Sequence, residues 1–340
     1  MNVNKILIIQ TAFIGDLILT TPLIRAAKRG FPKAWLSVLT IPRTAELLEG
    51  NPSVDEVLVY DKRGRDKGSR AFLKMVRGLR SGTFDLALIP HRSLRSALLP
   101  FLAGIPRRIG FDRSAGSFLF TKTIPYRMDV HQIERNLDLI SALGVKINDR
   151  LPEVYPDRHD QGVVRRFLSA NGISPSDRIV AIAPGSVWPT KRWLPERFAE
   201  LADRLIGEQG VKVLLIGGGS DIELCSSIAA MMRFGAVLTA GKMSLRQSAA
   251  LLSRSSLLLC NDSAPMHLAV AVRTPVVAIF GPTSPSFGFA PYDSNSLVIQ
   301  SDLECRPCGI HGGKRCPKGH FECMKRIHPE QVLKEIAKKL

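Results

Sequence analysis

The chain has 340 residues, a formal net charge of +17 and 45% hydrophobic residues. This length is typical of two domains of about 150 residues each, and the composition excludes a largely disordered chain. The N-terminal apolar segment is interrupted by Gln10, Gly15 and Asp16 and lacks a small-residue cleavage site. We therefore expect an unprocessed cytoplasmic protein without a membrane-spanning helix.

The positive charge is concentrated in the first half of the chain. Residues 1–150 contain 24 Lys or Arg against 13 Asp or Glu, and residues 62–113 contain 13 basic against three acidic residues. Such a field attracts nucleic acid, anionic lipid headgroups or a phosphorylated substrate, and charge alone does not choose among them. A basic surface that is merely solvated is the remaining alternative.

Short apolar runs alternate with amphipathic segments along the whole chain. The expected strands of the first half are 5–9, 35–39, 56–60 and 85–89, and its expected helices are 15–29, 68–80, 92–103 and 131–143. A linker is expected at 151–161, where prolines and charges coincide. The expected strands of the second half are 178–183, 212–217, 256–260 and 275–280. Apolar strands separated by helices predict two doubly wound α/β domains, with a ligand in the cleft between them.

Gly15 and Asp16 directly follow the first expected strand. Glycine permits a tight turn and a close approach of backbone to ligand. A carboxylate near a helix start is favoured in its ionised form by the helix dipole, so Asp16 can serve as a general base. A purely helix-capping role for Asp16 is the alternative.

The segment "APGSVWPTKRW" (183–193) follows the first strand of the second half. It lacks the second glycine of a phosphate loop, and Arg192 stands where Ser or Thr would hold magnesium, which argues against an NTPase. A diphosphate could still bind Gly185, Ser186 and Lys191. A basic surface turn is the alternative.

Two further strand ends carry candidate ligand contacts. Glycines 217–219 form a weak dinucleotide signal, because no GxGxxG follows the first strand of either half. In "CNDSAPMHLA", Asp262 could bind sugar hydroxyls, and the backbone N–H groups of Ser263 and Ala264 could bind phosphate at a helix start. His267, one turn later, is alternatively a packed core histidine.

A short segment, 304–324, is rich in cysteine. The thiols are those of Cys305, Cys308, Cys316 and Cys323. The CxxC indicates zinc as one possible ligand, and an iron–sulfur cluster is a less favoured one. The second pair is spaced Cx6C, which departs from paired zinc knuckles. No metal is assigned to the reaction.

Four segments in order, "GDLILTTPLI", "PGSVWPTKRW", "NDSAPMHLA" and "FGPTSP", resemble the lipopolysaccharide heptosyltransferases of glycosyltransferase family nine, with most likeness to the heptosyltransferase II branch. The resemblance implies a GT-B fold, in which two Rossmann-like doubly wound domains face each other across a cleft. It implies an acceptor-binding domain at 1–157 and a donor-binding domain at 158–327 that includes the Cys-rich loop 304–324. It also implies that a C-terminal helix at 328–340 packs back toward the first domain.

The resemblance implies inverting, metal-independent transfer of heptose from ADP-L-glycero-β-D-manno-heptose to the lipid-linked inner core of lipopolysaccharide, without a cofactor. Asp16 matches the family's catalytic base, and Lys191 matches the lysine near the donor phosphates. The donor-binding residues expected from the match or from their place at strand ends are Gly185, Ser186, Thr190, Lys191, Gly217, Asp262, Ser263, Ala264, Met266 and His267. The acceptor contacts expected from charge alone are Arg63, Arg65, Arg92 and Arg95.

The expected location is the cytoplasmic face of the inner membrane, in peripheral contact with anionic lipid. One alternative is another GT-B enzyme, a transferase or an epimerase, that uses a different nucleotide sugar. The other is a basic nucleic-acid-binding protein with a Cys-rich metal knuckle. The few aromatic residues near the arginines disfavour nucleic acid as a partner.

Overall fold

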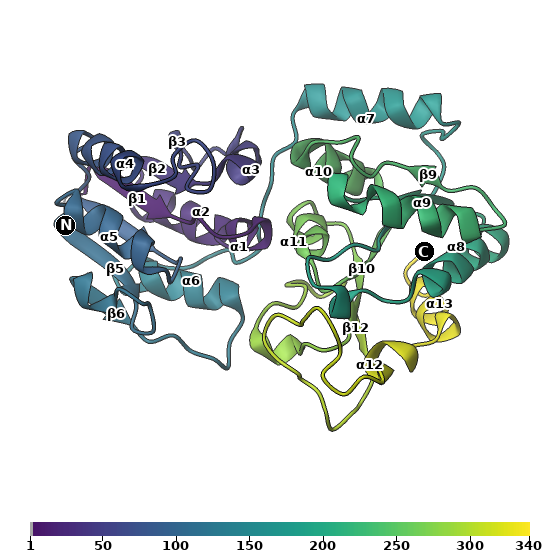
Figure 1. The fold of residues 1–340 in the computed structure, drawn as a ribbon. Helices are drawn as coiled ribbons and strands as arrows, with labels where there is room; N and C mark the ends of the chain where they lie inside the picture. Colours follow the sequence, from purple (N-terminus) through teal and green to yellow (C-terminus); the bar gives the residue numbers. More distant parts are fainter. Residues whose placement is uncertain (1–2) are drawn as a thin grey trace. The chain divides into compact units, whose positions relative to one another are not determined.

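The computed structural model describes residues 3–340 and consists of two compact units, which divide between Tyr155 and Pro156 (Figure 1). The division falls inside the expected linker 151–161. Each unit contains one six-stranded parallel sheet with helices on both of its faces. The predicted architecture of two doubly wound α/β domains is confirmed.

The sheet of the first unit has the strand order β3-β2-β1-β4-β5-β6. Its strands are β1 (Lys5–Ile9), β2 (Trp35–Thr40), β3 (Glu56–Val59), β4 (Leu86–Ile89), β5 (Arg107–Phe111) and β6 (Lys122–Ile124). In register, Ile6 pairs with Leu36 on one side and with Leu86 on the other. Strands β2 and β3 lie on one side of β1, and strands β4 to β6 lie on its other side, so the strand order reverses between β1 and β4. The carboxyl ends of β1 and β4 therefore form a topological switch point, where ligands bind in such sheets.

Helices cover both faces of this sheet. They are α1 (Ile14–Ile18), α2 (Thr21–Gly30), α3 (Pro42–Ala45), α4 (Ser69–Ser81), α5 (Leu94–Leu102) and α6 (Gln132–Ser141). Helices α4 and α5 bury Val76 and Leu99 in one core cluster with Leu7, while α2 packs against α6. Because Ile6 and Leu7, on opposite faces of β1, are both fully buried, each contributes roughly 1.5–3 kcal/mol of hydrophobic stabilisation.

The helix expected at 15–29 is divided into α1 and α2 in the structure. The Thr20 hydroxyl donates to the backbone oxygen of Asp16 at 2.7 Å, and Pro22 lies in the first turn of α2. Proline has no N–H and fixes its backbone angle, so it begins a new helix more readily than it continues an old one.

The sheet of the second unit has the order β12-β11-β10-β7-β8-β9. Its strands are β7 (Ile179–Ala183), β8 (Lys212–Leu215), β9 (Val237–Leu238), β10 (Leu257–Asn261), β11 (Val276–Phe280) and β12 (Leu297–Gln300). Numbered within the unit, this order is the same as in the first sheet. The second switch point therefore lies between β7 and β10, where Ala183 pairs with Cys260.

The helices of the second unit also form two layers. They are α7 (Arg158–Ala170), α8 (Pro195–Gln209), α9 (Ile222–Met231), α10 (Leu245–Arg254), α11 (Ala264–Ala271), α12 (Glu322–Lys325) and α13 (Pro329–Ala337). Helix α13 packs on α8, and its Leu333 and Ile336 share a core cluster with Phe198. The packing of residues 328–340 on the first domain stays a prediction. Within residues 3–340, every helix is too short or too polar to span a bilayer.

Candidate functional site

Lys191 and Asp262 form a buried ion pair at the switch point of the second sheet. Lys191 lies in the short 3-10 turn η3 (Pro189–Lys191) after β7, and Asp262 directly follows β10. The Nζ and Oδ2 atoms are 2.6 Å apart, and each side chain is 11% exposed. The Thr283 hydroxyl donates to the same Oδ2 at 2.8 Å. Two of the residues expected to bind the donor are thus brought together, and the ammonium of Lys191 is paired with a carboxylate.

Asn261 connects the segments that carry this pair. Its Nδ2 donates to the Pro184 oxygen at 2.8 Å, and its Oδ1 accepts from the Trp193 backbone N–H at 3.0 Å. The side chain is fully buried. Asn261 therefore fixes the ends of the segment that contains Lys191. Sequence reasoning assigned it no role, although a polar residue at the end of an apolar strand was the available signal.

Gly185 and Gly217 make room for the carboxylate of Asp221, a residue that was not among the expected site residues. A Cβ atom at Gly185 would lie 2.3 Å from Oδ1 of Asp221, and one at Gly217 would lie 2.6 Å from its Cβ. The Gly218 backbone N–H donates to Oδ2 of Asp221 at 2.9 Å. The absence of a side chain at both glycines therefore has a packing reason within the protein, besides any approach of a ligand.

Helix α11 begins at this same edge of the sheet. Its N-cap is Ser263, whose hydroxyl donates to the Asn261 oxygen at 3.3 Å, and Pro265 lies in its first turn. Met266 is fully buried and His267 is 6% exposed, and their expected contacts with the donor stay predictions. Among the donor-binding residues expected at the start of this helix, Ser263 and Ala264 are partly exposed.

The Cys-rich loop is docked on η3 through Thr190. The Thr190 backbone N–H and hydroxyl donate to the Gly313 oxygen at 3.1 and 2.9 Å, and the Gly313 N–H donates to the hydroxyl at 2.7 Å. Arg306 of the loop donates to the backbone oxygens of Gly281 and, at 2.8 Å, Thr283. The loop thus contacts segments next to both Lys191 and Asp262.

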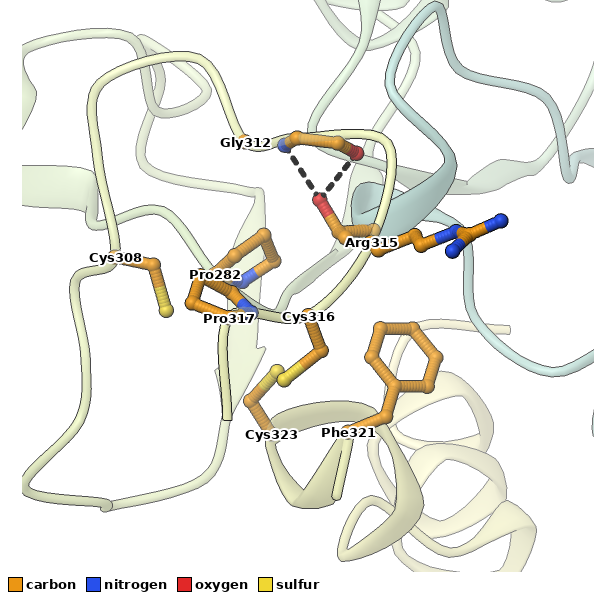
Figure 2. A pocket seen from close by; sticks show the side chains of 10 residues that line it. Pro282, Cys308, Gly312, Arg315, Cys316, Pro317, Phe321 and Cys323 are labelled. Atoms are coloured by element: carbon orange, nitrogen blue, oxygen red, sulfur yellow. Dashed lines mark hydrogen bonds between the residues drawn. The ribbon is translucent and has the colours of Figure 1, made fainter. Parts of the chain in front are cut away.

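Three of the loop's thiols line a small pocket beside Thr190, those of Cys308, Cys316 and Cys323. In Figure 2 the side chains of Cys316 and Cys323 point toward one another. Burial raises the pKa of Cys323 to about 11. Burial also raises the pKa of Cys316, but backbone N–H groups, that of Phe321 foremost, lower it by more. Within residues 3–340, no three His, Cys, Asp or Glu side chains are grouped so as to hold a metal ion.

Asp16 in the first unit caps α1. It is the third residue of that helix, and its Oδ2 accepts the Phe13 backbone N–H at 3.2 Å. The residue is partly exposed, so the carboxylate has both this capping contact and access to solvent. The two roles weighed for Asp16 are therefore compatible.

Thr11, Lys62 and His91 lie together at the switch point of the first sheet. Lys62 Nζ donates to the Thr11 backbone oxygen at 2.6 Å and to its hydroxyl at 3.2 Å. His91 Nδ1 is 3.1 Å from the Thr11 hydroxyl and 2.8 Å from that of Ser96. Burial, followed by the charges of Lys62 and Arg92, lowers the pKa of His91 to about 4. Sequence reasoning counted Lys62 in the basic field but did not single out this group.

The four arginines expected from charge divide into two pairs. The Arg92 guanidinium lies 4.1 Å from the centre of the Tyr126 ring, and Arg95 Nη1 donates to the Tyr60 hydroxyl at 3.0 Å. These two are held beside His91 and Lys62. Arg63 and Arg65 are exposed in the loop after β3, where Arg65 lies 3.6 Å from the carboxylate of Asp66.

Comparisons with known proteins find relatives along the whole chain. A family model described as glycosyltransferase family 9 (heptosyltransferase) matches residues 72–316. Lipopolysaccharide heptosyltransferase 2 of Escherichia coli K12 is 28% identical over 98% of this chain and 97% of its own length. The protein of the same name from Salmonella typhimurium gives the same identity and coverage.

Solved structures match both units of the fold. The family 9 glycosyl transferase from Veillonella parvula has a TM-score of 0.89 and 26% identity, with 99% of this chain and 98% of that chain covered. The E. coli ADP-heptose LPS heptosyltransferase II has a TM-score of 0.80 and 26% identity, with 98% of both chains covered. The fold expected from the resemblance, two Rossmann-like domains of the GT-B class, is confirmed.

Proposed function

Since the chain belongs to glycosyltransferase family 9 and is a glycosyltransferase, we propose that it transfers heptose from ADP-L-glycero-β-D-manno-heptose to the inner core of lipopolysaccharide. The relatives named lipopolysaccharide heptosyltransferase 2 support the sugar and the acceptor. The solved relative named for ADP-heptose supports the nucleotide. The observation that carries the proposal is that this near-complete match coincides with a Lys191–Asp262 pair at the switch point of the second sheet.

The donor would bind the second unit at the ends of β7 and β10. The Lys191 ammonium has three N–H donors, and one of them serves Asp262, so the others can reach oxygens of the diphosphate. The N-terminus of α11 adds backbone N–H groups and a positive dipole end, which favour phosphate. In Asp262, Oδ2 accepts from Lys191 and Thr283, which leaves Oδ1 for a sugar hydroxyl.

Asp16 would act as the general base on the acceptor. As the acceptor oxygen attacks the anomeric carbon of heptose, its proton passes to the carboxylate of Asp16. The bond from that carbon to the diphosphate oxygen breaks on the opposite face, so the configuration inverts and ADP leaves with the bonding electrons. Lys191 and the α11 amides would stabilise the charge that develops on ADP, a role that does not require a metal.

The acceptor would bind the first unit. Arg63, Arg65, Arg92 and Arg95 are the proposed contacts for its phosphate and carboxylate groups, because guanidinium groups pair with oxyanions in a bidentate way. The basic surface of this unit would also hold the protein at the anionic cytoplasmic face of the inner membrane.

A product assay tests the proposal. The purified protein is incubated with a heptose-deficient lipid A core acceptor and, separately, with ADP-heptose, ADP-glucose and UDP-sugars, with and without EDTA. We expect one added heptose by mass spectrometry with ADP-heptose only, an inverted anomeric configuration by NMR, and no effect of EDTA. Transfer from a UDP-sugar but not from ADP-heptose would refute the donor, and an EDTA-sensitive rate would refute metal independence.

A further inference from the structure

The Cys-rich loop has little regular structure of its own, and it is attached to the second unit at two places. Between β12 and α13, residues 301–328 contain one short helix, α12. On one side the loop is bonded to Thr190 through Gly313. On the other side Cys323 of α12 is buried in the core cluster of the second unit. Cys316 lies between these two attachments along the chain.

The thiols of Cys316 and Cys323 face each other. Both residues line the pocket beside Thr190, together with Cys308. In Figure 2 the side chains of Cys316 and Cys323 point toward one another, and the side chain of Cys308 lies apart from both. Cys316 is partly exposed, whereas Cys323 is 5% exposed. A small reagent from solvent can therefore reach Cys316 first, with Cys323 behind it.

The other two thiols of the loop have partners of their own. The Cys308 thiol donates to the Cys305 backbone oxygen at 3.2 Å, and Cys305 Sγ lies 3.9 Å from Nε2 of His320. Among the residues that the structure describes, no group of three possible ligands is arranged to hold a metal ion. The arrangement therefore favours a reactive pair, Cys316 and Cys323, over a site that uses all four thiols.

The two facing thiols differ in how readily they ionise. Burial raises the pKa of Cys316, but the backbone N–H groups of residues 318–321 lower it by more. Burial raises the pKa of Cys323 to about 11, although the charge of Arg306 opposes this effect. Because the thiolate is the nucleophile in thiol–disulfide exchange, Cys316 is the residue that attacks first.

We propose that Cys316 and Cys323 are a site of oxidative modification, at which a small disulfide such as glutathione disulfide links the two sulfurs and thereby holds the loop in place. The Cys316 thiolate attacks one sulfur of glutathione disulfide, forms a mixed disulfide and releases one glutathione thiolate. Cys323 loses its proton and attacks the Cys316 sulfur, and the second glutathione leaves as a thiolate. Two electrons pass from the protein to the reagent, which becomes two molecules of glutathione.

The link would hold the loop on the second unit more firmly. It joins the turn that begins at Cys316 to α12, whose Cys323 is fixed in the core. A covalent link removes more conformations from an open segment than from a docked one. Since Gly313 comes shortly before Cys316, its bonds to Thr190 should open less often once the link has formed. An effect of the link on donor binding rests on the proposed function, but the link itself does not.

Differential alkylation tests the pair in the full chain. Untagged protein is reduced, freed of the reductant and equilibrated at neutral pH in mixtures of glutathione and glutathione disulfide. The thiols are trapped by acid and alkylated, and mass spectrometry of the peptides identifies the linked pairs. We expect a Cys316–Cys323 link as the main product, reversed by dithiothreitol. A Cys305–Cys308 link in its place, or stoichiometric zinc or iron that is released when Cys316 is alkylated, would overturn the proposal.

Single variants separate the two roles. Cys316→Ser should abolish the link, and Cys323→Ser should stop the reaction at the mixed disulfide, so that glutathione accumulates on Cys316. Cys323→Ala serves if serine in the core unfolds the protein. Cys308→Ser is the matched control, because it removes another thiol of the same pocket and should leave the link unchanged. A link that is lost in Cys308→Ser but kept in Cys323→Ser would assign the pair wrongly.

Amide hydrogen exchange measures what the link does to the loop. In the oxidised wild type, exchange at Gly313 should be at least about fivefold slower than in the reduced protein. Cys323→Ser treated with the same mixtures should show no such change. A link that forms and leaves exchange at Gly313 unchanged would overturn its role in holding the loop. Both measurements are made without substrate, so their failure leaves the proposed function standing.

Discussion

Asp16 shows at the scale of one residue how a structural role and a chemical role can share a carboxylate. Its Oδ2 accepts the Phe13 N–H, yet the residue is partly exposed. An asparagine at this position keeps a side-chain oxygen that can accept the Phe13 N–H but cannot act as a base at neutral pH. A substitution can therefore separate capping from general-base chemistry.

Asp16→Asn should lower kcat by about 10²–10⁴, the usual contribution of a positioned base. The dissociation constant of ADP, measured by calorimetry, should stay within a few-fold of the wild type, and the thermal midpoint should hardly change. Asp129→Asn, an exposed carboxylate of the same unit, is the matched control and should keep full activity. Retained turnover in Asp16→Asn would reject the assigned role.

The Lys191–Asp262 pair allows a test in which stability and ligand binding change differently. Lys191→Met should destabilise the second unit by about 3 kcal/mol, because it leaves a buried carboxylate with Thr283 as its remaining partner. The double variant Lys191→Met with Asp262→Asn should recover part of that loss in urea denaturation.

In both variants we expect ADP to bind at least tenfold more weakly, as measured by calorimetry on folded protein. Unchanged ADP affinity in the double variant, with the fold intact, would remove Lys191 from the donor site. The single variant alone would not decide this, because its loss of stability could weaken binding indirectly.

At the scale of single residues, the sequence predicted which residues belong to the candidate site better than it predicted their contacts. Lys191 and Asp262 were both assigned to the donor, but they are 71 positions apart, and their pairing depends on β7 and β10 being neighbours. The packing of Asp221 against Gly185 and Gly217 has the same cause. Thr11, Lys62 and His91 also come from three separate strand ends, so no local pattern could join them.

At the scale of elements, continuous apolar runs predicted the buried central strands of both sheets. The strands that were not predicted, β5, β6, β9 and β12, lie toward the edges of their sheets and are short or partly exposed. In β5, for example, Arg107 and Arg108 are only half buried, so the run has no apolar signature. Strand β9 has two residues, which is below what any periodicity can indicate.

The docking of the Cys-rich loop on η3 leads to a prediction about an element. Thr190→Val removes the hydroxyl that bonds to both the N–H and the oxygen of Gly313. We expect faster amide hydrogen exchange at Gly313 and a KM for the donor raised about three- to tenfold, since Lys191 follows directly in the chain.

Ser227→Ala is the control, because it removes an exposed hydroxyl of α9 that bonds only within its own helix. This substitution should change neither the amide exchange at Gly313 nor KM for the donor. Faster exchange at Gly313 with an unchanged donor KM would mean that the loop is docked near the donor site without positioning it.

At the scale of the molecule, two units with the same strand order share no recognisable sequence repeat. Parallel sheets need buried strands and covering helices, and many sequences satisfy that requirement. The charge distinguishes the units. Residues 1–150 carry 24 basic against 13 acidic residues, and part of that excess forms a stripe on one helix.

The stripe consists of Arg70, Lys74 and Arg77, which are exposed on α4 at helical spacing. If the first unit meets an anionic leaflet through it, each cation contributes about 1 kcal/mol near the membrane surface. Replacing all three by Gln should therefore weaken binding to vesicles with anionic lipid by about 100-fold at low salt. Sedimentation with vesicles measures this, and neutral vesicles or higher ionic strength should abolish the difference. Because these residues are not among the proposed acceptor contacts, kcat on a water-soluble acceptor should not change. A triple variant that still binds anionic vesicles fully would exclude α4 as the membrane contact.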